Sequence, residues 1–115
     1  MTNADGPLPL ATDVQTVKEL IDGGHEFLLL DCREKDEHEF VRLEQATLIP
    51  MSELESRREE LESHRQSHII VMCHIGGRSQ RVTQWLRALG FPQVQNMSGG
   101  IDAWAAEIDP ALPRY

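Results

Sequence analysis

Short apolar runs alternate with amphipathic stretches along most of the chain. Four runs of strand length predict strands, at residues 27–30, 46–49, 68–72 and 94–97. Apolar residues at helical spacing predict helices near residues 12–22, 52–61, 79–89 and 101–108. This alternation is typical of a small α/β domain with a mainly parallel sheet and helices on both faces.

Local signals mark where these helices begin. Thr12 with Gln15, and Ser52 with Glu55, show the spacing of a capping box. Ser79 is predicted to be the N-cap of the helix at 79–89. Trp85 and Trp104 fall on the apolar faces of their helices and are expected in the core.

In a parallel α/β sheet, sites lie at the carboxyl ends of the strands. This rule selects residues 31–33, 73–79 and 98–100. The second segment contains the predicted nucleophile and the predicted substrate-binding residues. They are Cys73, followed by His74, Ile75, Gly76, Gly77, Arg78 and Ser79.

Cys73 lies between a strand end and a helix start, and the two glycines let the intervening backbone curl with its N–H groups pointing inward. Those N–H groups and the helix dipole favour a thiolate at Cys73. Arg78 adds a planar fork of donors suited to thiosulfate, sulfonate or phosphate. We therefore predict that Cys73 is a nucleophile and that Arg78 binds an anion, whereas the His74 side chain is expected to point to solvent or a partner.

Length and charge narrow the class of protein. The 115 residues predict one domain, residues 1–115, and the net charge of −8 disfavours nucleic acid and anionic membranes as partners. The acidity is uneven, because residues 1–68 hold 16 acidic and 7 basic residues while residues 69–115 hold 3 and 4. An anionic ligand is thus expected in the second half.

Other features bear on location and cofactors. No run approaches the roughly 18 apolar residues of a membrane span, and residues 1–7 lack the pattern of a secretory signal. We expect a cytoplasmic protein with reduced cysteines. Two cysteines without a Cys/His cluster predict neither a metal site nor a cofactor.

Three ordered motifs resemble the rhodanese homology domain, a sulfurtransferase module, over nearly the whole chain. They are Asp31-Cys32-Arg33-Glu34 with Glu37, the loop at residues 73–79, and Gly99-Gly100 followed by Trp104. The resemblance implies a rhodanese-like fold and a Cys73 persulfide, formed from thiosulfate or a persulfide donor and passed to cyanide, a thiol or a protein. The loop N–H groups would stabilise the persulfide, and Arg78 would orient the donor.

A narrower likeness involves residues 42–50 and 108–115, which look most like the rhodanese domain of E1-like enzymes that activate sulfur carriers. It implies a cysteine desulfurase or a sulfur-carrier protein as partner. Whether the chain stands alone or belongs to a larger enzyme stays open.

The chain also departs from the family pattern. Residues 41–46 lack the histidine that many members carry, and whether Arg42 faces the site is open. The candidate accessory residues of the site are Asp31, Arg33 and Arg42. Cys32 stands where valine is usual. It is expected to be a small buried hydrophobe, with the alternative that it resolves Cys73 by forming a disulfide.

Two other functions compete with sulfur transfer. Cysteine-dependent phosphatases and arsenate reductases of related fold use a loop with five residues between cysteine and arginine, whereas Cys73 and Arg78 enclose four. The shorter loop favours a single sulfur atom over a phosphoryl group. A non-catalytic rhodanese-like binding module would be expected to lack the cysteine or the arginine, and this chain has both.

Overall fold

A computed structural model describes residues 8–115 and shows a five-stranded sheet in the order β1-β5-β4-β2-β3. The strands are β1 (Ala11–Thr12), β2 (Leu28–Asp31), β3 (Ala46–Leu48), β4 (Ile69–Met72) and β5 (Val94–Met97). Every pairing is parallel. The predicted α/β class is confirmed, and the prediction about a secretory signal at residues 1–7 lies outside the described residues.

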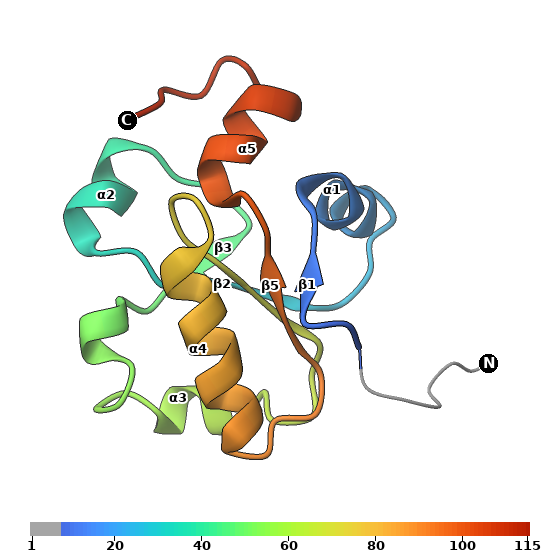
Figure 1. The fold of residues 1–115 in the computed structure, drawn as a ribbon, viewed down its shortest axis with the longest axis vertical. Coiled ribbons are helices and arrows are strands. Elements are labelled where there is room, and N and C mark those ends of the chain that lie inside the picture. Colours follow the sequence, from blue (N-terminus) through green and yellow to red (C-terminus); the bar gives the residue numbers. More distant parts are fainter. Residues whose placement is uncertain (1–7) are drawn as a thin grey trace.

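Helices cover both faces of this sheet (Figure 1). They are α1 (Val14–Asp22), α2 (Lys35–Phe40), the 3-10 turn η2 (Met51–Glu53), α3 (Glu59–Glu62), α4 (Gly77–Ala88) and α5 (Gly100–Glu107). Two buried clusters show the layering: α3 and α4 pack on one face, and α1 and α5 on the other.

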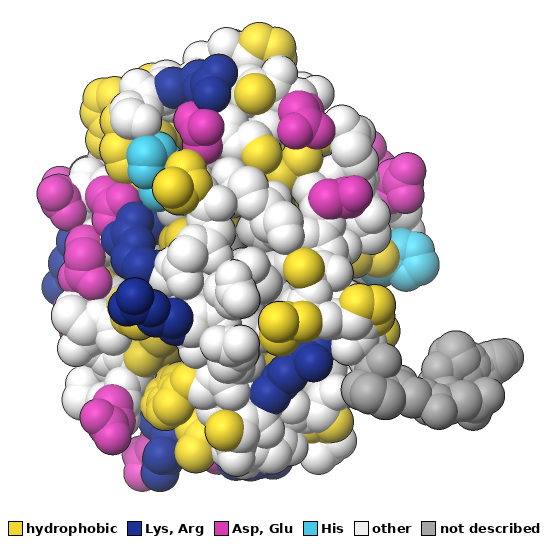
Figure 2. All heavy atoms as spheres, in the orientation of Figure 1, with side chains coloured by type: hydrophobic (Ala, Val, Ile, Leu, Met, Phe, Trp, Pro, Cys, Tyr) yellow, Lys and Arg dark blue, Asp and Glu magenta, His cyan; other side chains and the backbone are white. Residues whose placement is uncertain are grey.

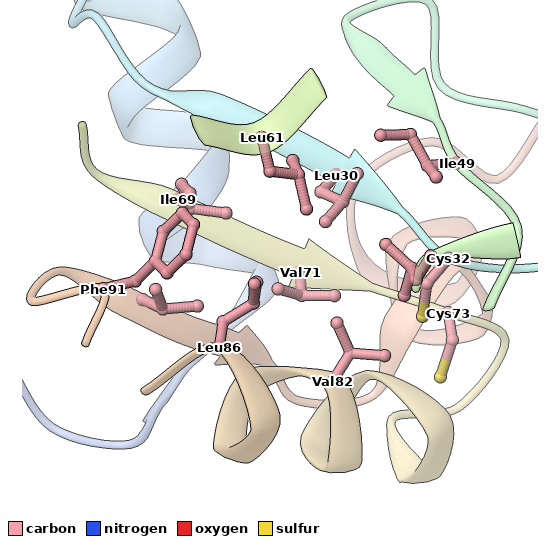
Figure 3. Close-up of a cluster of buried hydrophobic side chains, with 12 residues drawn as sticks. Leu30, Cys32, Ile49, Leu61, Ile69, Val71, Cys73, Val82, Leu86 and Phe91 are labelled. Carbon is pink, nitrogen blue, oxygen red and sulfur yellow. The ribbon is translucent and has the colours of Figure 1, made fainter. Parts of the chain in front are cut away.

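The central strand β4 contributes to both clusters because its side chains alternate between the faces. Ile69 and Val71 join the cluster beneath α4 (Figure 3), whereas Ile70 and Met72 join the cluster beneath α1 and α5. All four are fully buried. A continuous apolar run is the expected pattern for a strand covered on both faces.

The tryptophan predictions differ in outcome. Trp104, on α5, is buried in the cluster beneath α1 and α5, with 5% of its surface exposed. Trp85 is only partly buried and packs at the edge of the other cluster.

Both predicted capping boxes are wrong. Thr12 belongs to β1, where it pairs with Met97 of β5, and Asp13 caps α1 by accepting the Thr16 N–H at 2.8 Å. The Ser52 hydroxyl instead donates to Glu34 at 2.7 Å. The predicted helix at 52–61 is accordingly replaced by η2, turns and the short α3.

Helix α2 was not predicted because it has no apolar face: none of its residues is buried, and Phe40 is 55% exposed. Polar contacts stabilise its start, where the Glu37 carboxylate accepts the Glu34 N–H at 3.1 Å. This helix carries Glu37 to the candidate site.

Candidate functional site

Two cysteines lie at the same edge of the sheet. Strands β2 and β4 pair with Asp31 opposite Met72, so the next residues, Cys32 and Cys73, leave neighbouring strand ends (Figure 3). Both thiols are free and buried. The structure thus brings together the ends of β2 and β4.

Hydrogen-bond donors surround the Cys73 sulfur. The N–H groups of Gly76 and Ser79 point at Sγ, with N···S distances of 3.1 and 3.4 Å. The curl depends on Gly76, whose φ of 118° lies in the left-handed region. Backbone N–H groups at the start of a helix stabilise negative charge, so the arrangement favours an anionic sulfur at this position.

The prediction that Ser79 is the N-cap of α4 is wrong, because Gly76 occupies that position. The Ser79 hydroxyl lies 3.3 Å from Cys73 Sγ, and closer to Oδ1 of Asn96 on β5. A hydroxyl has one proton. Because Asn96 is its nearest acceptor, the two backbone N–H groups are the steadier donors to sulfur. The sequence analysis did not select Asn96 as a site residue, although a polar side chain in a buried strand is a signal of a specific hydrogen-bonding role.

The Gly99-Gly100 motif lets the start of α5 form hydrogen bonds with the backbone of the loop at residues 73–79. The N–H groups of Ile101 and Asp102 donate to the carbonyl oxygens of Cys73 and His74, at 2.9 and 3.0 Å. A Cβ on Gly100 would collide with those same carbonyl groups. Glycine at this position therefore lets the start of α5 approach the loop closely.

Arg78 forms a two-pronged ion pair with Glu37 of α2. Its Nη1 and Nη2 donate to the two carboxylate oxygens at 2.7 and 2.8 Å. Hydrogen bonds from Arg78 are the chief cause that lowers the pKa of Glu37 from 4.5 to about 2. A guanidinium has five N–H donors, so the edge turned away from Glu37 remains available to a ligand.

This ion pair predicts a pH dependence of folding stability. Because the Glu37 pKa is lowered on folding, the contribution is complete above pH 4.5 and is lost as the pH falls towards 2. Urea unfolding at a series of pH values should therefore show a steeper loss of stability over this range for the wild type than for Glu37→Gln. Parallel pH profiles would contradict the assignment.

Asp31 and Arg33 form a second ion pair whose side chains are fully buried. Arg33 Nη2 donates to Asp31 Oδ2 and to the Val41 carbonyl oxygen, each at 2.8 Å. Its Nη1 donates to the Tyr115 hydroxyl at 3.1 Å. Neither Asp31 nor Arg33 lines the cavity at Cys73, so their place in the structure is that of a buried support.

A cavity of about 610 Å³ is lined in part by Cys73. Its lining combines loop residues with the first turns of α4: Cys73, His74, Ile75, Gly77, Arg78, Gln80, Arg81 and Gln84. Figure 2 shows basic side chains beside the start of α4. Arg81, which the sequence reasoning did not select, adds a second cation to the rim.

The remaining predicted residues lie differently. Arg42 lines a separate cavity with Lys18 and Trp104, and its nearest ion-pair contact is to Glu44 at 3.8 Å. The His74 ring does not point to solvent: it stacks on Tyr115, with ring centroids 3.9 Å apart.

Within residues 8–115, no group of three or more His, Cys, Asp or Glu side chains is arranged to hold a metal ion. Over the same residues, no helix has the length and apolar character needed to cross a membrane.

Comparisons with known proteins agree on the fold and the family. The Rhodanese-like domain profile matches residues 13–107. The Arabidopsis thaliana protein "Adenylyltransferase and sulfurtransferase MOCS3" is 33% identical over 112 residues, which cover 85% of this chain and 24% of that protein. A Zea mays relative, MOCS3-1, is 35% identical over 103 residues, covering 85% of this chain and 22% of its own length. The chain thus spans about a quarter of the curated relatives it matches.

Solved structures show the same architecture. The thiosulfate sulfurtransferase from Pseudomonas aeruginosa is 27% identical with a TM-score of 0.77, over 96% of this chain and 21% of that one. The human single-domain sulfurtransferase TSTD1 matches with a TM-score of 0.74 at 23% identity, over 87% of this chain and 98% of that one, and supports the fold alone. With the profile matching residues 13–107, the chain belongs to the rhodanese-like domain family, whose members similar to it include sulfurtransferases.

Proposed function

We propose that this chain is a sulfurtransferase that carries a sulfane sulfur as a persulfide on Cys73. The observation that supports it most is the position of Cys73, which lines a cavity and whose Sγ is within reach of the Gly76 and Ser79 N–H groups. The relationship to proteins named as sulfurtransferases adds independent support.

The reaction with thiosulfate needs no further reactant. The Cys73 thiolate attacks the outer sulfur of thiosulfate; a new S–S bond forms, the S–S bond of thiosulfate breaks, and sulfite leaves with the bonding electrons. Cyanide then attacks the outer sulfur of the Cys73 persulfide. Thiocyanate leaves and the Cys73 thiolate is restored.

The loop residues have separate roles in this scheme. The Gly76 and Ser79 N–H groups stabilise the negative charge on the Cys73 thiolate and then on its persulfide. Arg78, held by Glu37, offers its free edge to the sulfonate oxygens of the donor. His74, Ile75 and Gly77 shape the cavity wall.

For the natural reaction we propose a persulfide donor, such as a cysteine desulfurase, and a protein acceptor of the sulfur-carrier type. The support is the similarity to relatives named adenylyltransferase and sulfurtransferase. Thiosulfate and cyanide remain the practical assay reagents for the chemistry at Cys73.

One assay compares this proposal with the phosphatase alternative. The protein is incubated with thiosulfate and cyanide, and in parallel with p-nitrophenyl phosphate, and thiocyanate and nitrophenol are measured. Thiocyanate without nitrophenol supports sulfur transfer, whereas Cys73-dependent release of nitrophenol alone would support the phosphatase. Neither product would favour a binding module. The four-residue spacing between Cys73 and Arg78 favours the first result.

Cys32 is expected to be dispensable. Burial is the main cause that raises the pKa of its thiol, so it stays protonated and is a poor nucleophile at neutral pH. Cys32→Ala should retain thiocyanate formation within about twofold of the wild type. A loss as large as that of Cys73→Ser would instead show that the two cysteines act as a pair.

A further inference from the structure

Tyr115 lies against the loop that follows Cys73. Its ring stacks on the His74 ring with an interplanar angle of 9°, and Phe40 of α2 packs edge-on at 5.8 Å. The preceding residue, Arg114, is ion-paired with Asp102 of α5 at 3.1 Å, which holds this segment beside the loop. Tyr115 thus lies between α2 and the loop.

The Tyr115 hydroxyl makes two hydrogen bonds. It donates to Glu37 Oε2 at 2.8 Å and accepts from Arg33 Nη1 at 3.1 Å. Arg78 Nη2 donates to the same Glu37 oxygen at 2.8 Å. Tyr115 therefore contacts the cavity residue His74 directly with its ring and is linked to a second cavity residue, Arg78, through Glu37.

A rigid hydrogen-bond partner is needed to fix the orientation of the Arg78 guanidinium at the edge of the cavity. Arg78 carries several rotatable bonds, and about a third of its side-chain surface is exposed, so a fixed carboxylate limits the directions of its donors. Glu37 has its own rotamers, and the Tyr115 hydroxyl and the Glu34 N–H fix one of them. The buried Arg33 fixes the Tyr115 hydroxyl in turn.

We propose that Tyr115 is a positioning residue of the Cys73 site: its ring holds His74 and the loop, and its hydroxyl holds the Glu37 carboxylate that orients Arg78. This rests on the proposed sulfur transfer and extends it to a residue that lies 42 positions from Cys73 in the sequence. The two parts of the side chain have separate consequences, which two variants distinguish.

Tyr115→Phe keeps the ring and removes the hydroxyl, whereas Tyr115→Leu removes both. Neither changes a charge, so an altered KM reports the orientation of Arg78 and not the net field at the cavity. For thiosulfate we expect KM to rise about threefold in Tyr115→Phe and about tenfold in Tyr115→Leu, with kcat within about twofold.

The ring is tested by a reaction that needs no sulfur transfer. Alkylation of Cys73 by iodoacetamide, in a Cys32→Ala background, should be at least about threefold faster in Tyr115→Leu, because a loosened loop exposes the sulfur more often. It should be unchanged in Tyr115→Phe. NMR should show ring-current shifts of the His74 ring protons in the wild type and in Tyr115→Phe but not in Tyr115→Leu.

Phe40→Leu is the matched control, since it removes an aromatic neighbour of Tyr115 but none of the hydrogen bonds. Its KM should stay within about twofold of the wild type. The proposal is overturned if folded Tyr115→Leu keeps the wild-type KM and alkylation rate. It is also overturned if Phe40→Leu changes the KM and the alkylation rate as much as Tyr115→Leu does. If the wild type takes no sulfur from thiosulfate, the proposed function fails, and the alkylation rates and NMR shifts still decide whether Tyr115 holds the loop.

Discussion

Replacing Cys73 by serine is expected to lower thiocyanate formation from thiosulfate and cyanide by at least about 10³-fold. An alcohol at this position stays protonated at neutral pH, and attack on thiosulfate would have to form an S–O bond in place of a persulfide. The measurement is the initial rate with both substrates near saturation.

Folding should be little affected by this change, because serine is slightly smaller and its oxygen lies among the N–H groups of Gly76 and Ser79. Thermal unfolding of the variant checks this point, and Cys32→Ala serves as the control for removing a buried thiol. Retention of the wild-type rate by folded Cys73→Ser would contradict the proposed mechanism.

The largest expected effect on stability comes from Arg33→Leu, which should lower the free energy of unfolding by about 3–5 kcal/mol. The change leaves the fully buried Asp31 carboxylate without its cation and removes the hydrogen bond to the Val41 carbonyl. Urea unfolding followed by circular dichroism gives the difference directly.

Arg114→Leu is the matched control, because it breaks an arginine–aspartate pair whose side chains are 53% and 31% exposed. An exposed pair contributes at most about 1 kcal/mol. If Arg33→Leu lowers the free energy of unfolding no more than Arg114→Leu does, the buried Asp31–Arg33 pair does not stabilise the fold as its burial and hydrogen bonds indicate.

Much of the fold could be predicted because burial on both faces leaves a clear pattern. The apolar runs of β2 and β4 and the helical spacing of Val82, Trp85 and Leu86 all correspond to observed elements. Strand β1 has two residues, too few to show a pattern, and was missed. Helix α2 has no apolar stripe, and its start depends on the hydrogen bond between Glu34 and Glu37.

The candidate site likewise has a part that local sequence predicts and a part that it does not. The position of Cys73 and the glycine-dependent curl follow from local sequence, since strand, loop and helix start are consecutive. The partners of the loop do not: Glu37 reaches Arg78 from 41 residues away, and Asn96 reaches Ser79 from 17. Such pairings depend on how α2 and β5 pack around the loop, which local patterns do not encode.

The most direct test of the central claim is the intact mass of the reduced protein before and after incubation with thiosulfate. We expect a gain of one sulfur atom, located on the peptide containing Cys73, absent in Cys73→Ser and removed by cyanide with release of thiocyanate. No gain of mass in the folded wild-type protein, or a gain that persists in Cys73→Ser, would contradict sulfur transfer through a Cys73 persulfide.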